Sequence, residues 1–267
     1  MSEQAADYSL AELMICAGAE AFRGDGEILA TGIGLLPRLG ASLAMRTFSP
    51  DLMMTDSEAW LLSTPNPVSG MTTTNGLNRE TWMGFSRIFD NVWSGRRHAL
   101  VGPSQIDRYG QSNISALGGT YAQPKVQMLG VRGYPGNSIS HVNSFFVSAH
   151  SERVFIAGEC DVVCSVGYNP ARLPKGYSFD DIEIRQVITD LCVMDWQGPN
   201  HQLRVLSVHP GIDVQEVIDK TGFELAFADV IECTVAPTQA QLAIIQQLDP
   251  LNLRAQQLKG NPSGRRA

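Results

Sequence analysis

The stretch GEILATGIGLLPRLGASLAMRTFSPDLMMT, residues 26–55, contains a complete strand–turn–helix–strand unit. Its apolar start, GEILATG, is typical of a strand and runs into the closely spaced Gly32 and Gly34. Helical periodicity follows over 38–48, and the apolar strand DLMMT (51–55) begins after a Ser-Pro break. Glycines between a strand and a helix, followed by a second strand, are typical of doubly wound sheets. The sequence therefore predicts an α/β fold with an open, mostly parallel sheet and flanking helices.

The regions on either side of this unit extend the same pattern. A capping box, Ser9-x-x-Glu12, predicts a first helix that Gly24 is placed to end. Further helices are expected over 80–95, 213–222 and 236–250, and strands over 98–102, 126–131, 144–150, 153–158, 161–167, 184–196 and 202–210. We interpret residues 1–267 as a single domain whose last residues, 260–267, form a flexible tail.

Composition excludes several classes of function. The net charge of −7 and the scattered Lys and Arg residues exclude nucleic acid as a main partner. There is no run of about 18 apolar residues, so no membrane span is expected. The polar N-terminus and five cysteines in mostly apolar surroundings predict reduced thiols and a cytoplasmic location. The spacing of Cys160 and Cys164 does not match a zinc site, and no metal is expected.

A glycine cluster follows an apolar run in the middle of the chain. Gly130, Gly133 and Gly136 lie in GVRGYPGNSISH (130–141), which also contains a Pro-Gly turn signature. Exposed backbone N–H groups in such a segment could bind a phosphate or a developing oxyanion. The alternative is a β-turn without a ligand.

Polar residues follow two predicted strands. Asp56, Ser57 and Glu58 come directly after the strand over 51–55. In open parallel sheets, the carboxyl ends of strands line the ligand crevice, although these residues could equally begin a solvated loop. A second polar group, in VGPSQIDRYGQSN (101–113), follows the next strand and indicates either a tied turn or a substrate site.

Four segments, in the same order, resemble the β subunits of class I coenzyme A transferases. GPSQIDRYGQSNIS (102–115) resembles the family's G-x-x-Q-[IV]-D-x-[YF]-G-x-x-N, and PKVQMLGVRGYPG (124–136) its P-K-x-x-x-x-G-x-G-G. The segments over 31–52 and 209–225 resemble its first β-turn-helix-strand unit and its closing P-G and T-G-F motif. The resemblance covers nearly the whole chain and implies the class I CoA-transferase (NagB/RpiA-like) fold.

One position departs from the transferases. Their nucleophilic Glu would fall on Ser57, which is followed by Glu58 and Ala59 rather than by Ser/Asn-Gly. The chain is most similar to a subgroup of the family, the β subunits of steroid-ring-opening acyl-CoA hydrolases. This resemblance implies retro-Claisen hydrolysis of a carbon–carbon bond in the last ring of a cyclohexenone-type acyl-CoA, in cholesterol and steroid catabolism. It also implies an α subunit that supplies the main catalytic Glu, an α2β2 heterotetramer, and no cofactor beyond the coenzyme A of the substrate.

The resemblance also assigns residues to the site. Ser57 and Glu58 are the catalytic candidates on this chain and would lie on the pocket wall. Arg132 could pair with a carboxylate of the substrate, because a guanidinium suits that geometry. The substrate-binding candidates are Gln105, Gly130, Arg132, Gly133, Tyr134, Gly136 and Asn137, with Gln105 more readily explained as structural support. Two alternatives remain: a true transferase that uses Glu58, and a non-catalytic scaffold for the partner.

Overall fold

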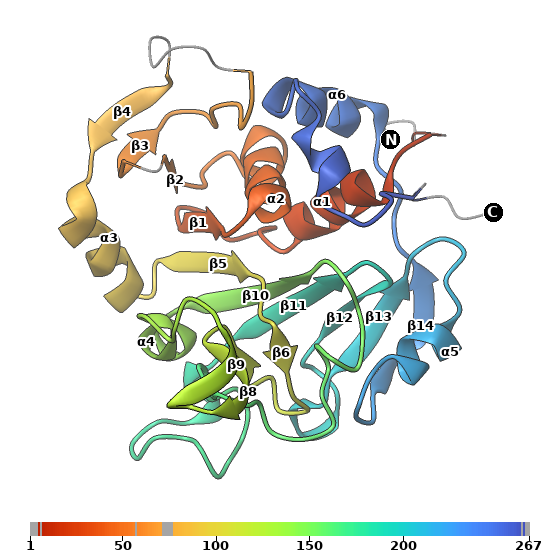
Figure 1. The fold of residues 1–267 in the computed structure, drawn as a ribbon. Coiled ribbons are helices and arrows are strands. Elements are labelled where there is room, and N and C mark those ends of the chain that lie inside the picture. Colours follow the sequence, from red (N-terminus) through yellow and green to blue (C-terminus); the bar gives the residue numbers. More distant parts are fainter. Residues whose placement is uncertain (1–4, 6, 57, 71–76, 263, 265–267) are drawn as a thin grey trace. The chain divides into compact units, whose positions relative to one another are not determined.

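The computed structural model describes residues 5, 7–56, 58–70, 77–262 and 264 of the chain (Figure 1). It divides into two compact units, each built from more than one stretch of sequence. Unit 1 comprises Met1–Val101, His209–Gly211 and Thr234–Ala267, and unit 2 comprises Gly102–Val208 and Ile212–Cys233. The interpretation of the chain as one domain stays a prediction.

Unit 1 is built on the strand–turn–helix–strand segment. β1 (Leu29–Gly32) and β5 (Arg97–Val101) pair in parallel, and Met53 joins β1 through a parallel bridge to Leu29. The helix after β1, α2 (Leu35–Arg46), begins at Leu35 rather than at residue 38. A Cβ added to Gly32 would lie 2.3 Å from the backbone nitrogen of Arg38, so only glycine allows α2 to begin this close to the strand.

The first helix, α1 (Leu10–Glu20), confirms the predicted capping box. The Ser9 hydroxyl accepts a hydrogen bond from the Glu12 backbone N–H, and the Glu12 carboxylate accepts one from the Ser9 N–H at 2.8 Å. The helix ends at Glu20, before the predicted Gly24. At the other end of the chain, α6 (Gln239–Leu248) and the 3-10 turn η3 (Leu253–Gln256) complete the unit. Of the predicted tail, Pro262 accepts a hydrogen bond from the Leu10 N–H, while residues 263 and 265–267 lie outside the described residues.

A second, antiparallel sheet of unit 1 follows α2. It consists of β2 (Met54–Thr55), β3 (Trp60–Leu62) and β4 (Arg79–Trp82), and leads into α3 (Gly84–Trp93). The prediction of one helix over 80–95 is therefore wrong at its start. Trp82 pairs with Trp60 as a strand residue, and Gly84, with φ of +65°, changes the backbone direction before the helix.

Unit 2 contains five strands of a mixed sheet. β10 (Val142–Val147) and β11 (Ile184–Thr189) are parallel, β12 (Cys192–Asp195) is antiparallel to β11 and to β13 (Arg204–Val208), and β14 (Ala226–Cys233) is parallel to β13. The remaining elements are β6 (Gln105–Ile106), β7 (Ser112–Asn113), β8 (Ala116–Thr120), β9 (Gln123–Gln127), α4 (Tyr134–Ser140), α5 (Val214–Asp219), η1 (Phe179–Asp181) and η2 (Pro199–His201). The predicted α/β fold with a mostly parallel sheet is confirmed, with β12 as its antiparallel member.

Several local predictions for unit 2 are wrong. The segments 153–158 and 161–167 are not strands but loops, each joined to the fold by an isolated bridge. Their apolar residues fill the core without joining a ladder: Phe155 is fully buried, yet its N–H bonds to the Ser151 carbonyl in a turn. β9 ends at Gln127, so the predicted strand over 126–131 stops early, and β14 was not predicted at all.

Three features of the described residues bear on the expectations from composition. No helix among the described residues has the length and apolar character to cross a bilayer. Four cysteines are buried as expected, whereas Cys233 is exposed. The described residues contain no group of three or more His, Cys, Asp or Glu side chains arranged to hold a metal ion.

Candidate functional site

A hollow of about 550 Å³ in unit 1 brings together charged residues from three elements. We call it the charged hollow. Its walls come from the end of β1, the start of α2, the β2–β3 turn and β4, and its charged side chains are Arg38, Asp56, Glu58 and Arg79. Of the two sequence candidates for catalysis, Glu58 lines the hollow, whereas Ser57 lies outside the described residues.

Asp56 ties the turn between β2 and β3. Its Oδ1 accepts hydrogen bonds from the backbone N–H groups of Glu58, at 2.9 Å, and Trp60, at 3.0 Å. An Asp that binds the backbone two and four residues on is a standard way to fix a tight turn. Ala59 adopts a left-handed conformation, with φ of +63°. The strand therefore ends at Thr55, and Glu58 belongs to a turn rather than to a continuing strand.

Arg79 clamps this turn from β4. Its guanidinium lies 2.6 Å from Asp56 Oδ2 and 2.7 Å from Glu58 Oε2. Burial is the largest single effect on the Asp56 carboxyl and raises its pKa. The hydrogen bonds from Trp60, Arg79 and Glu58 together outweigh burial and hold the pKa of Asp56 below its usual value. Asp56 is therefore a fixed anion, while the Glu58 side chain is 64% exposed.

Arg38 presents a second cation to the charged hollow. It is half-buried on α2, and its Nη1 donates to the carbonyl oxygen of Thr55 at 3.3 Å. Burial lowers the pKa of Arg38, and the negative charge of Asp56 partly offsets this effect. A guanidinium remains charged even so. The hollow thus contains two guanidinium groups and two carboxylates, which suits polar or anionic groups rather than an apolar chain.

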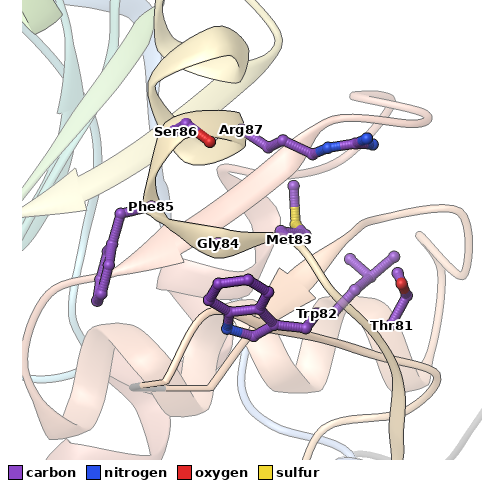
Figure 2. A pocket seen from close by; sticks show the side chains of 8 residues that line it. Thr81, Trp82, Met83, Gly84, Phe85, Ser86 and Arg87 are labelled. Carbon is purple, nitrogen blue, oxygen red and sulfur yellow. The ribbon is translucent and has the colours of Figure 1, made fainter.

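A second hollow of unit 1, of about 570 Å³, lies between β3, β4 and the start of α3 (Figure 2). We call it the aromatic hollow, since Trp82 and Phe85 stand on either side of Gly84. The Trp82 Nε1 donates to the backbone carbonyl oxygen of Glu58 at 3.1 Å. A Cβ on Gly84 would come within 3.3 Å of the Trp82 ring. Trp82 is thus held in one orientation although it is 59% exposed.

Sequence reasoning missed both Arg79 and Trp82. The aromatic residues lie within the helix predicted over 80–95, and Arg79 directly precedes that helix, at the end of a segment (63–79) that is rich in turn-forming residues. Part of that segment, residues 71–76, lies outside the described residues. The regular spacing of Phe85, Phe89 and Trp93 was the one available signal.

In unit 2, the polar residues of the segment 102–113, which we call the signature turn, mainly bind one another. Asp107 Oδ1 accepts from the backbone N–H groups of Tyr109 and Gln111, and its Oδ2 accepts from the Gln111 side chain at 2.7 Å. Burial raises the pKa of Asp107 to about 6, although these hydrogen bonds favour the charged form. Gly110 has φ of +74° at the tip. The segment is a tightly hydrogen-bonded turn.

Gln105 is engaged at both ends of its amide. Its Oε1 accepts from the Asn113 side chain at 2.8 Å and from the Asp161 N–H at 3.0 Å. Its Nε2 donates to Asp161 Oδ2 at 3.1 Å. This arrangement agrees with structural support, and a direct contact of Gln105 with substrate stays a prediction.

The glycine segment 130–137 forms the start of a helix rather than a simple turn. Tyr134, Gly136 and Asn137 belong to α4, and Gly133 is its N-cap. The Pro135-Gly136 pair predicts a turn. In the structure, Pro135 is instead the second residue of α4, where a missing backbone N–H has no cost. The other three candidates precede α4 or cap its start: Gly130, Arg132 and Gly133. All candidates of this segment are therefore neighbours along the chain.

The environments of these candidates differ. Gly130 has φ of +78°, and a Cβ added there would meet nothing within 4 Å, so its backbone is open to close approach. Arg132 is exposed, and the described residues offer it no ion pair. Tyr134 is buried, with its hydroxyl accepting from Ser112 at 3.2 Å, and burial raises the pKa of this phenol. All three belong to unit 2, whereas Glu58 belongs to unit 1.

Comparison with known proteins gives close relatives, although no family model matches the chain. The chain is 41% identical to the cholesterol ring-cleaving hydrolase IpdB subunit of Rhodococcus jostii, over 95% of this chain and 98% of that protein. The crystal structure of Rhodococcus jostii IpdAB matches with a TM-score of 0.86 and 40% identity, over 94% of this chain and 99% of the other. The crystal structure of glutaconate coenzyme A-transferase from Acidaminococcus fermentans matches with a TM-score of 0.76 and 22% identity, over 94% of this chain and 98% of the other. The last likeness concerns the fold alone and confirms the predicted CoA-transferase fold.

Proposed function

Because the chain belongs to the family of cholesterol ring-cleaving hydrolase IpdB subunits, we propose that it is the β subunit of a ring-opening acyl-CoA hydrolase. The observation that carries the proposal is the 41% identity, which extends over 95% of this chain and 98% of the relative. The partner is an IpdA-like α subunit, in an α2β2 assembly in the cytoplasm. The substrate is a steroid-derived, cyclohexenone-type acyl-CoA, so coenzyme A arrives with the substrate and no separate cofactor is needed.

The proposed reaction is hydrolytic cleavage of a carbon–carbon bond β to the thioester carbonyl. A carboxylate of the α subunit removes a proton from water, whose oxygen adds to the ring ketone. The bond between that carbon and the α-carbon then breaks. The ketone carbon becomes a carboxylic acid, and the electron pair becomes the enolate of the thioester, which takes up a proton. Opening the ring in this way consumes one water and needs no oxidant.

This chain contributes binding groups and electrostatics to the reaction. The open backbone around Gly130 and Gly133 supports a role in approaching the thioester oxygen. Arg132 is an exposed guanidinium that suits a carboxylate of the substrate. In the charged hollow, Asp56 and Arg79 fix the β2–β3 turn. By sequence, the position at which transferases carry their nucleophile falls on Ser57.

The alternative, a transferase that uses Glu58, has one observation in its favour, namely that the Glu58 carboxylate lines the charged hollow. Against it, this carboxylate is paired with Arg79 at 2.7 Å, which stabilises the free anion relative to a thioester. A scaffold without any role in binding is the third alternative.

Trapping distinguishes the alternatives. The reconstituted complex is incubated with acyl-CoA, treated with borohydride or hydroxylamine, and this chain is analysed by mass spectrometry. We expect no adduct on Glu58, and one ¹⁸O from labelled water in the new carboxyl group of the product. An adduct on Glu58 would establish the transferase instead. Ring opening by this chain alone would overturn the two-subunit proposal. Unchanged turnover in both Arg132→Ala and Glu58→Ala, within a normal complex, would favour the scaffold.

A further inference from the structure

We propose that α3 and the end of β4 form the surface of this chain that binds the α subunit. The surface, which we call the aromatic patch, consists of Trp82, Phe85, Phe89 and Trp93. This inference rests on the proposed function, because that function names the partner. It adds the face of the chain by which the partner is bound.

The aromatic patch exposes more apolar side-chain area than is favourable for a surface that faces only water. The side chains of Trp82, Phe85, Phe89 and Trp93 are 59%, 66%, 56% and 70% exposed. The three on α3 are spaced four residues apart and therefore share one side of the helix. Val92 faces inward and is buried, so α3 has an apolar residue on its inner side as well as aromatic residues on its outer side. A helix with a solvated outer face would have polar residues there.

The patch has the size expected of an interface centre. Aromatic side chains bury about 150–250 Å² each, so the exposed parts of these four amount to roughly 400–600 Å². A stable interface takes about 800 Å² from each partner. The patch alone would therefore supply around half or more of this chain's share of a stable interface, and tryptophan is enriched among the residues that dominate such contacts.

One end of the patch is held ready for binding. Trp82 is fixed by its hydrogen bond to Glu58, and its ring lies so close to Gly84 that a Cβ there would come within 3.3 Å of it. Beside it, the aromatic hollow opens between Trp82 and Phe85 (Figure 2). A side chain of the partner inserted there would meet a preformed wall, which reduces the entropy lost on binding.

The position of the patch selects the α subunit as its occupant. In the proposed reaction, the catalytic carboxylate comes from the partner and replaces the one that transferases carry on the β2–β3 turn. The partner must therefore reach that turn. Trp82 is hydrogen-bonded to Glu58 of the same turn, so the patch begins where the partner's catalytic group has to arrive. A second copy of this chain would bring no such group.

Assembly is the direct test. The chain with Phe85→Ser and Phe89→Ser is mixed with the α subunit, and the dissociation constant is measured by sedimentation or native mass spectrometry. We expect affinity to fall by at least about 30-fold, as for the loss of a dominant aromatic contact. Tyr121→Ser removes an aromatic residue of unit 2 that is 75% exposed, and should leave affinity unchanged. Unchanged affinity in the double variant, with unaltered circular dichroism, would overturn the proposal.

A second measurement covers the case in which the double variant does not fold. Hydrogen exchange of the wild-type chain is followed with and without the α subunit, and amides over 82–93 should become protected. Unchanged amide exchange over 82–93 would count against the interface. A double variant that still binds the α subunit, and only loses association with copies of its own chain, would also count against it. If the double variant forms an intact complex but has a raised KM for acyl-CoA, the patch is a substrate surface instead. Because assembly is measured without turnover, a complex that forms through α3 but opens no ring would contradict only the proposed function.

Discussion

The Trp82 indole Nε1 donates a hydrogen bond to the Glu58 carbonyl oxygen at 3.1 Å, and so joins an exposed aromatic side chain to the β2–β3 turn. Replacing Trp82 by Phe keeps an aromatic ring but removes the donor. We expect the free energy of unfolding to fall by about 1 kcal/mol, the usual net value of one hydrogen bond. We also expect amide exchange of the turn to accelerate and kcat/KM of the complex to fall several-fold. Trp93→Phe, at a residue that is 70% exposed, is the matched control for stability and amide exchange, and equal behaviour of the two variants in these two measurements would contradict this role of Trp82.

The clamp of Arg79 on Asp56 gives a prediction with a defined pH dependence. The Asp56 pKa is held below its usual value of 3.8, so its contribution to stability is present above that pH and is lost as the pH falls through the folded-state pKa. Arg79→Gln should therefore destabilise the chain modestly at pH 7, because the pair is partly exposed, and the difference should vanish once Asp56 is protonated in acid. Arg23→Gln breaks the exposed pair with Glu20 and should cost less. A loss for Arg79→Gln that stays the same however far the pH is lowered while the chain remains folded would rule out this origin.

The features that the sequence predicts well are those whose cause is local. The Ser9 and Glu12 capping box needs only residues three positions apart, and both of its hydrogen bonds are present. The glycine at position 32 is likewise explained by the helix that follows within a few residues. The family motifs predicted the fold as a whole, because their order along the chain already contained the topology.

The features that the sequence does not reveal arise from contacts between distant segments. Phe155 fills the core from a turn, and its apolar character alone does not distinguish a buried turn from a strand. Arg79 reaches Asp56 across 23 residues, through pairing of β3 with β4 that no local pattern encodes. The turn with Asp56 and Glu58 was therefore expected as part of the site, whereas its clamp was not.

Gly110 in the signature turn has two reasons to be glycine. Its φ is +74°, and a Cβ would lie 2.8 Å from Ile184 Cδ1 and 3.1 Å from the Trp196 ring. Gly176 has φ of +93° with nothing within 4 Å, so its replacement by Ala adds only backbone strain, about 1 kcal/mol. Gly110→Ala should cost about 1–3 kcal/mol more, since it also overpacks the core. Urea unfolding of both variants measures the difference, and equal costs would show that Gly110 is required only for its backbone conformation.

Asp107, in the same turn, should oppose stability as the pH rises. Burial raises the pKa of its carboxyl to about 6, against 3.8 for the free side chain. Between these two values the folded chain binds more protons at this site than the unfolded chain, so the unfolding free energy contributed by Asp107 falls as the pH increases.

Asp107→Asn removes the titration but retains a side-chain oxygen for the Tyr109 and Gln111 N–H groups. The unfolding free energy of the wild type minus that of the variant should therefore fall between pH 4 and pH 7, by on the order of 2 kcal/mol. Gly176→Ala changes no charge, and its difference from the wild type should stay constant over this range. A wild-type advantage over Asp107→Asn that grows with pH would mean that the hydrogen bonds to the carboxylate outweigh its burial.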